Sequence, residues 1–304
     1  MALSVVTFNI GGGDGTRYLK KRMINRFLSE HQPSVIYFQE NPWRKRYIKN
    51  HVPKIKERYE AVSHEHFDAT VLYRKDVLKD KGSAELWELF RDAFNDKSHL
   101  DFVTFKERAS FSNLAEIKTG TSFVAISWHG EYKEKKKKEK FEDLLLVINE
   151  INSKTKLPVV LGGDFNITLD SVSDSIEEQG LEVYEYDLQN RKTIIDFFVV
   201  TRDVNLSDVR AFGDYMYINV KVQLRQQLFD FPLSGFIGSN KQKYVVGGEV
   251  EKRKQVFDHD PVQALVSFDF DKEDEDQTSV REGEYTFDDD LDGVAYYLKN
   301  FLFK

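Results

Sequence analysis

Polar side chains that could bind a metal ion or a phosphate follow several short apolar runs of this sequence. In each case the polar residue stands at or just beyond the carboxyl end of a strand-like run. These residues are Asn9 after residues 5–8, Glu40 after 35–38, His129 after 123–128, and Asp164 and Asn166 after 159–163. Ligands of α/β sheets bind beyond the carboxyl ends of the strands. We therefore expect these side chains to meet at one edge of a sheet.

Two further segments carry the same chemistry. Asp196 stands inside the apolar run 194–200, and Asp258-His259-Asp260 precedes the apolar run 262–268. A carboxylate inside an apolar strand requires a partner, because an unpaired charge is costly to bury. Carboxylate and amide oxygens suit hard cations such as Mg²⁺, Mn²⁺ or Ca²⁺ rather than zinc. Histidines can transfer protons or donate hydrogen bonds to a phosphoryl oxygen.

The apolar runs predict the elements that must position these side chains. Short β-branched runs indicate strands at residues 3–8, 34–38, 69–73, 111–117, 122–128, 158–161, 194–200 and 262–268. Apolar residues at helical spacing indicate helices at 18–28, 84–94, 141–151 and 170–179. Adjacent strands at 111–128 predict an antiparallel hairpin, and Gly-Gly at 247–248 predicts another within 244–250. Strands that alternate with helices predict an α/β protein with mixed sheets.

Composition excludes several classes of protein. The 304 residues include no cysteine, which excludes a disulfide scaffold, a thiolate metal site and a cysteine nucleophile. Hydrophobic residues make up 40% of the chain and aromatic residues 13%, which is enough for a large core. No apolar run approaches the roughly 18 residues of a membrane span, and the first residues do not resemble a signal peptide. We expect an intracellular protein, nuclear or cytoplasmic, without stable membrane association.

The net charge of −7 is distributed unevenly along the chain. Residues 269–292 contain 12 acidic and 2 basic residues, whereas residues 1–60 contain 12 basic and 5 acidic residues. The basic N-terminal part is compatible with an anionic substrate such as nucleic acid. We expect the acidic segment to be flexible. The amphipathic helix predicted at 293–304 needs an apolar surface, either on this chain or on a protein partner.

The order and spacing of the polar motifs resemble the endonuclease/exonuclease/phosphatase superfamily. Its strongest signatures are Gly-Asp-Phe-Asn at 163–166 and Asp-His-Asp-Pro-Val at 258–262, and the similarity extends over residues 3–268. The resemblance implies a four-layer α/β/β/α sandwich of two packed mixed sheets, with a metal-dependent phosphoesterase site at one rim. It implies a catalytic domain at 1–268, followed by the acidic segment at 269–292 and the helix at 293–304.

The resemblance also implies a metal site and a water-activating group. Glu40 is expected to be the principal metal ligand, with Asn9 beside it and Asp258 completing the carboxylates on the metal side. Mg²⁺ is the expected metal, with Mn²⁺ as the alternative. Asp164 is expected to orient or deprotonate the attacking water, and Asn166 to hold a phosphate oxygen.

The remaining roles fall to the histidines and one arginine. His259 is expected to contact the scissile phosphate while Asp196 orients it, and His129 matches a second acid/base of some nucleases. Arg108 matches an arginine that contacts phosphate. Phe257 stands where the family usually has serine, and no glutamate could be matched as the partner of His129.

These residues favour a Mg²⁺-dependent phosphodiesterase, foremost a DNA or RNA nuclease. A phosphomonoesterase, or an enzyme acting on lipid headgroups or inositol phosphates, is the alternative on the same scaffold. A catalytically silent nucleic-acid or protein binding module is the third reading, and retention of Glu40, Asp164 and His259 counts against it. The basic run 44–46 and the lysine run 135–138 fit either phosphate contacts or solvated surface.

Overall fold

The computed structural model describes residues 2–11, 16–43, 48–62, 68–82, 84–95, 102–132, 135, 137–186, 193–223, 227–230, 243–246 and 249–268. Contacts divide the chain into two units, Met1–Asp269 and Phe270–Lys304. The predicted acidic segment at 269–292 and the predicted helix at 293–304 lie outside the described residues, as does the basic run 44–46. Among the described helices, none combines the length and apolar character that crossing a membrane requires.

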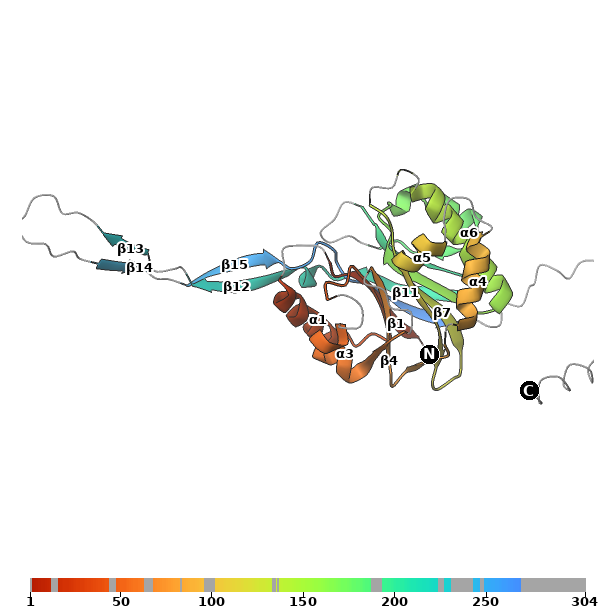
Figure 1. Ribbon diagram of the computed structural model, residues 1–304, viewed down its shortest axis with the longest axis horizontal. Helices are drawn as coiled ribbons and strands as arrows, with labels where there is room; N and C mark the ends of the chain where they lie inside the picture. The colour runs from red at the N-terminus through yellow and green to blue at the C-terminus, as the bar shows by residue number, and fades with distance from the viewer. Residues whose placement is uncertain are drawn as a thin grey trace, which may run out of the picture. The chain divides into compact units, whose positions relative to one another are not determined.

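Two six-stranded sheets form the centre of the first unit (Figure 1). The first contains β1 (Leu3–Asn9), β2 (Val35–Gln39), β3 (Tyr59–Ala61), β4 (Ala69–Arg74), β11 (Val204–Ala211) and β16 (Val262–Phe268). The second contains β5 (Leu78–Asp80), β6 (Ala109–Glu116), β7 (Ser122–His129), β8 (Val159–Asp164), β9 (Glu182–Val183) and β10 (Asp196–Val200). Their strand orders are β11-β16-β1-β2-β4-β3 and β5-β6-β7-β8-β10-β9. Both sheets are mixed, because β1 and β2 run parallel, as do β7 and β8, whereas the other neighbours are antiparallel.

The two sheets pack face to face through one apolar cluster. Tyr37 of the first sheet and Phe198 of the second meet edge to face, with ring centroids 5.8 Å apart. Gly162 allows this approach, since a Cβ there would come 2.7 Å from the Phe198 ring. Strands β1 and β2 therefore lie over β7 and β8, and the carboxyl ends of both parallel pairs can reach one rim.

Helices cover the outer face of each sheet (Figure 1). Beside the first sheet lie α1 (Arg17–His31), α2 (Ile48–His51) and α3 (Pro53–Arg58), and beside the second lie α4 (Ala84–Asn95), α5 (Phe102–Arg108), α6 (Lys137–Thr155) and α7 (Ser173–Glu178). The side chain of Thr16 caps α1 by accepting a hydrogen bond from the Leu19 amide. Two helical layers around two sheets confirm the predicted four-layer α/β/β/α sandwich.

Each predicted strand is present, and several extend further than expected. Strands β1, β2, β7 and β8 continue to Asn9, Gln39, His129 and Asp164, so these polar residues are held by sheet hydrogen bonds. The helix expected at 170–179 is instead a 3₁₀ turn, η1 (Leu169–Ser171), followed by α7. Val172 separates the two with a non-helical φ of −132°.

The expected hairpin at 111–128 is confirmed by the antiparallel pairing of β6 with β7. The hairpin expected within 244–250 is wrong. Strand β14 (Lys243–Val246) pairs with β13 (Gln227–Asp230), and β15 (Glu249–Gln255) pairs with β12 (Tyr217–Gln223). Strand β14 thus pairs with the strand before it and β15 with β12, so the two segments on either side of 247–248 do not pair with each other. Residues 247–248 lie outside the described residues, and so does the loop at 12–15.

Candidate active site

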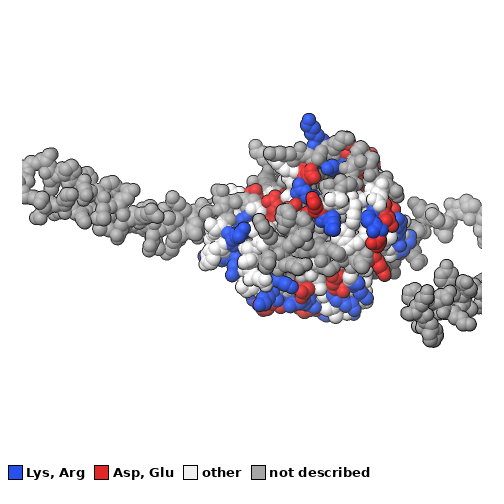
Figure 2. Space-filling model, in the orientation of Figure 1, with Lys and Arg blue, Asp and Glu red and all other residues white. Residues whose placement is uncertain are grey.

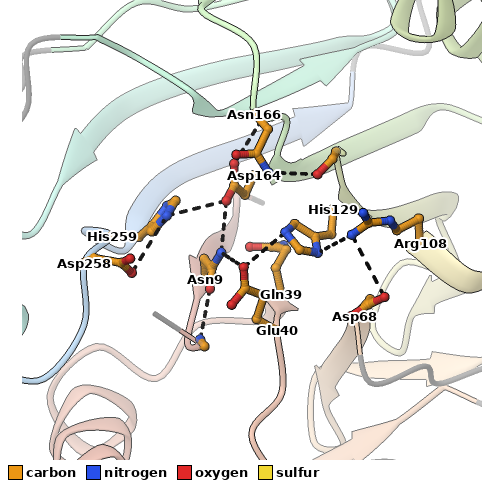
Figure 3. Close-up of polar contacts among 12 residues, drawn as sticks. Asn9, Gln39, Glu40, Asp68, Arg108, His129, Asp164, Asn166, Asp258 and His259 are labelled. Carbon is orange, nitrogen blue, oxygen red and sulfur yellow. Dashed lines mark hydrogen bonds and ion pairs between the residues drawn. The ribbon is translucent and has the colours of Figure 1, made fainter. Parts of the chain in front are cut away.

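Four strands deliver polar residues to one rim of the sandwich (Figure 3). In the first sheet, Asn9 at the end of β1 lies opposite Gln39 at the end of β2, directly before Glu40. In the second sheet, His129 at the end of β7 lies opposite Asp164 at the end of β8. The two strands of each parallel pair thus end side by side at the same edge of the sheet. This explains how polar residues far apart in sequence come together.

Asn9 connects the carboxylates of the two sheets. Its Nδ2 donates hydrogen bonds to Asp164 Oδ2 at 2.9 Å and to Glu40 Oε1 at 3.2 Å. Its Oδ1 accepts from the Gly11 amide at 2.9 Å. The side chain is buried, and it holds two like charges near each other by donating to both.

Asp164 lies at the centre of the site and is only 1% exposed. Its Oδ1 accepts from the amide of Asn166, which adopts the left-handed conformation with φ 52°. The Asn166 side chain donates to the Gly130 carbonyl at 2.7 Å. Burial, reinforced by the negative charge of Asp196, raises the pKa of Asp164 above that of an ordinary aspartate.

His259 and Asp196 form a buried pair. His259 Nδ1 lies 2.9 and 3.0 Å from the two carboxylate oxygens of Asp196. Because β10 pairs with β8, Asp196 lies directly opposite Asp164 in the sheet. His259 Nε2 consequently faces Asp164 Oδ2 at 3.5 Å and Asp258 Oδ1 at 3.8 Å. An imidazole held in this way presents Nε2 beside the carboxylate of Asp164.

Glu40 is held in a strained position next to His129. Its backbone has φ 52°, a value that residues other than glycine adopt at a cost of about 1–3 kcal/mol. His129 Nε2 lies 3.3 Å from Glu40 Oε1. This hydrogen bond, with a smaller contribution from Asn9, lowers the pKa of Glu40 to about 2, so the carboxylate is ionised at neutral pH. Gly11 makes room for it, because a Cβ there would come 2.1 Å from the Glu40 side chain.

The structure brings all the predicted site residues to this rim through an unbroken series of polar contacts. They are Asn9, Glu40, Arg108, His129, Asp164, Asn166, Asp196, Asp258 and His259. Arg108 joins the series through His129 Nδ1, which lies 3.0 Å from its Nη1. The functional roles of these residues remain predictions, but the convergence on which those roles depend is present.

Lys20 is a site residue that the sequence did not single out. It lies on the buried face of α1 and is 3% exposed. Its Nζ donates to the Ile10 carbonyl at 2.8 Å and to the Gly11 carbonyl, and it lies 5.6 Å from the centre of the Phe257 ring. Burial lowers the pKa of Lys20, while the charges of Asp258 and Glu40 oppose that shift. A lysine among the apolar positions of a predicted helix is the signal that could have revealed it.

Lys20→Met is expected to destabilise the fold by about 1–3 kcal/mol, because the carbonyls of Ile10 and Gly11 lose a charged donor in a buried place. Urea unfolding followed by circular dichroism measures the effect. Lys21→Met, one residue along α1, is the matched control and is expected to change stability by less than about 0.5 kcal/mol. Equal stability of the two variants would show that the carbonyls do not need Lys20.

Gln39, also not singled out, joins the two sheets beneath the site. It is fully buried, accepts from Thr7 Oγ1 at 3.3 Å, and donates to the Tyr37 carbonyl at 3.0 Å and to Ser127 Oγ at 3.1 Å. Ser127 Oγ in turn donates to the Phe38 carbonyl at 3.2 Å. This network ties β1 and β2 to β7 directly below the rim that carries these polar residues.

Gln39→Leu is expected to cost about 1–3 kcal/mol of stability, because it leaves polar groups of Thr7, Tyr37 and Ser127 buried without this partner. Chemical unfolding of Gln39→Leu, Ser127→Ala and the double variant forms a thermodynamic cycle. We expect the double variant to be less destabilised than the sum of the single variants. Strict additivity would mean that the two side chains do not interact.

Two groups of side chains could hold a cation. Ligand atoms of Asp164, Asp196 and His259 lie within 4.8 Å of one another, but Asp196 and His259 are already hydrogen-bonded together. The side chains of Glu40 and Asp258 are 40% and 46% exposed, so they can accept a hydrated ion. Carboxylates that are ionised and open to water suit Mg²⁺, which keeps several of its waters. The donor set at the rim therefore fits a hard divalent cation, and the choice of Glu40 with Asp258 as its ligands stays a prediction.

Comparison with solved structures identifies the fold. An endonuclease/exonuclease/phosphatase family protein from Bacteroides thetaiotaomicron matches with a TM-score of 0.61 and 17% identity, over 89% of this chain and 99% of that one. The mannosyl-6-phosphatase of the same organism, strain VPI-5482, matches with a TM-score of 0.59 and 16% identity, over 88% and 100%. D. rerio TDP2, complexed with a single-strand DNA product, matches with a TM-score of 0.50 and 12% identity, over 88% and 99%.

By sequence, no protein-family description and no curated protein matches the chain. The structural matches nonetheless cover nearly the whole of the similar proteins. This chain therefore has the endonuclease/exonuclease/phosphatase fold, which confirms the expectation drawn from the motifs at 163–166 and 258–262.

Proposed function

We propose that this protein is a metal-dependent phosphoesterase and, more specifically, a phosphodiesterase that cleaves DNA or RNA. The observation that carries the proposal is the convergence of Asn9, Glu40, Asp164 and the Asp196–His259 pair at one rim of this fold. Each residue comes from a different strand end or loop, and each is held by hydrogen bonds to another member of the group. Ordinary turn or surface residues do not need such an arrangement.

Each residue then has a role in hydrolysis of a phosphoester. A divalent cation held by Glu40 and Asp258, with Asn9 beside them, would neutralise negative charge on the phosphoryl oxygens. Asp164 accepts a proton from, or orients, the attacking water. His259 Nε2 donates to a phosphoryl oxygen while Asp196 holds its Nδ1. Asn166, whose backbone amide donates to Asp164 Oδ1, would hold a phosphate oxygen.

Nucleic acid is favoured by the basic N-terminal part of the chain and by the likeness to TDP2, which was solved with a DNA product. Surface charge gives no further support on the face drawn in Figure 2, where Lys and Arg are interspersed with Asp and Glu. The sequence did not single out Lys137, which stands at the start of α6. Its Nζ donates to the Asn166 carbonyl at 2.8 Å. This contact brings one cation of the 135–138 lysine run to the site.

A second candidate is a phosphomonoesterase that acts on a sugar phosphate. The observation that favours it is the higher TM-score to the mannosyl-6-phosphatase, 0.59, than to TDP2, 0.50. Both reactions need the same cation and the same water-activating carboxylate. They differ in the chemical group attached to the phosphate, which the protein must also bind.

Hydrolysis assays with matched substrates test the proposal. The purified protein is incubated with single-stranded DNA, double-stranded DNA, RNA, a hexose 6-phosphate and an inositol phosphate, each with Mg²⁺, Mn²⁺ or EDTA. Cleavage of a nucleic acid that requires the metal and is lost in Asp164→Asn supports the nuclease. Release of phosphate from the small esters alone supports the second candidate. Binding of nucleic acid without turnover of any substrate would contradict both and leave a binding module.

A further inference from the structure

His129 is held between two charged side chains of opposite sign (Figure 3). Its Nδ1 lies 3.0 Å from Arg108 Nη1, and its Nε2 lies 3.3 Å from Glu40 Oε1. The ring is 7% exposed, so these two neighbours, rather than water, determine where its proton resides. This differs from the carboxylate partner that an acid/base histidine commonly has at its second nitrogen.

Arg108 determines which nitrogen of His129 can carry hydrogen. A guanidinium has N–H donors, no acceptor, and stays charged at every pH relevant to proteins. The contact at 3.0 Å therefore requires His129 Nδ1 to accept. The hydrogen of the neutral ring then resides on Nε2, and this N–H donates a hydrogen bond to Glu40. A hydrogen on Nδ1 would face an N–H of Arg108, and a ring protonated on both nitrogens would also place a second positive charge beside the guanidinium.

Asp68 supports Arg108 from the other side. Its Oδ2 lies 4.0 Å from Arg108 Nη1, and the two side chains are 20% and 22% exposed. Arg108 is the last residue of α5, directly before β6, and β6 pairs with the strand that ends at His129. The polar contacts thus form one series that ends at the expected metal ligand. Arg108 faces Asp68 and donates to His129, and His129 donates to Glu40.

We propose that Arg108 fixes His129 in the tautomer with hydrogen on Nε2, and that His129 is a positioning residue for Glu40 rather than a second acid or base. The role assigned to Glu40 rests on the proposed function, whereas the tautomer rests only on the contacts of His129. Glu40 has a backbone conformation that glycine prefers and that costs energy for other residues. A fixed hydrogen-bond donor at His129 would help to keep the Glu40 carboxylate in this position.

The tautomer is measured directly by ¹H–¹⁵N correlation spectra of the full chain labelled in histidine, without metal, at neutral pH. The signals of His129 are assigned by their loss in His129→Gln, with His51→Gln as the control for the exposed ring that stacks on Trp43. We expect a protonated Nε2 and an unprotonated Nδ1 in the native protein, and averaging between the tautomers in Arg108→Met. Hydrogen on Nδ1, or on both nitrogens, would overturn the proposal.

Activity separates positioning from proton transfer. A glutamine amide offers a carbonyl to Arg108 and an N–H to Glu40, as the proposed tautomer does, but it cannot exchange a proton with substrate. On the substrate that the hydrolysis assays identify, we expect His129→Gln to stay within about tenfold of the native kcat/KM. We expect His129→Leu to lose about 10²-fold or more of kcat/KM. Equal, large losses would contradict the positioning role. Absence of all hydrolysis together with the expected tautomer would refute the proposed function and leave the tautomer assignment standing.

Discussion

Asp164→Asn is expected to lower kcat/KM by about 10²–10⁴-fold, the range found when a positioned acid/base or an electrostatic group is removed. The asparagine has nearly the same shape, but it cannot take a proton from water. Its amide would also place a donor or a neutral oxygen where Asn9 Nδ2 now donates to a carboxylate at 2.9 Å. Steady-state hydrolysis of the substrate identified in the assays, at saturating Mg²⁺, measures the effect.

The control for this variant is Asp170→Asn, an exposed aspartate in the turn that follows β8. It changes the net charge by the same amount and is expected to leave kcat/KM within about twofold, as surface substitutions usually have little effect. Urea unfolding should show both variants folded. Retention of more than about a tenth of the native activity by Asp164→Asn would remove Asp164 from the role of water activation.

Glu40→Gln is expected to weaken Mg²⁺ binding by at least about 10–100-fold, the loss that even an outer partner of a metal ligand produces. The variant removes a carboxylate at the rim whose pKa is lowered to about 2 and which is therefore ionised throughout the neutral range. Isothermal titration of Mg²⁺ into the protein without substrate gives the affinity without reference to turnover. Hydrolysis by the variant should recover only at much higher Mg²⁺.

Two comparisons sharpen this result. Glu60→Gln is the matched control, since Glu60 is a surface carboxylate, 43% exposed, whose Oε1 lies 3.4 Å from Lys49 Nζ. Asp196→Asn tests the alternative cation group of Asp164, Asp196 and His259. Native Mg²⁺ affinity in Glu40→Gln, together with its loss in Asp196→Asn, would move the metal to that buried group.

Local sequence patterns predicted most of the elements that carry the site. The β-branched runs that end at Asn9 and His129 were recognisable because a buried strand is apolar on both faces and changes abruptly to polar residues where it leaves the core. The pairing of Asp196 with His259, 63 positions apart, followed from the resemblance to a known family. The physical need of a buried carboxylate for a partner supported it.

Other features were not predictable because they depend on which distant segments become neighbours. The Gly-Gly at 247–248 is a good local signal for a turn, yet β14 and β15 pair with β13 and β12. Strand pairing is decided by the register of whole segments, to which a two-residue signal contributes little. Lys20 likewise resembles a solvated lysine in sequence, and only the packing of α1 beside Gly11 and Phe257 buries it.

The sequence by itself determined the alternation of strands and helices, the identity of the polar residues at the strand ends and hence the chemistry available to them. Only the tertiary structure decided how these residues act on one another. Arg108 is a charged residue at a helix end in the sequence, and in the folded chain its N–H faces the ring of His129. A hydrogen bond forms only when donor and acceptor atoms come within about 3 Å of each other. The distance from Arg108 to His129 is reached when β6 pairs with β7, and the distance from His129 to Glu40 is reached when the two sheets pack together. No local pattern encodes either distance.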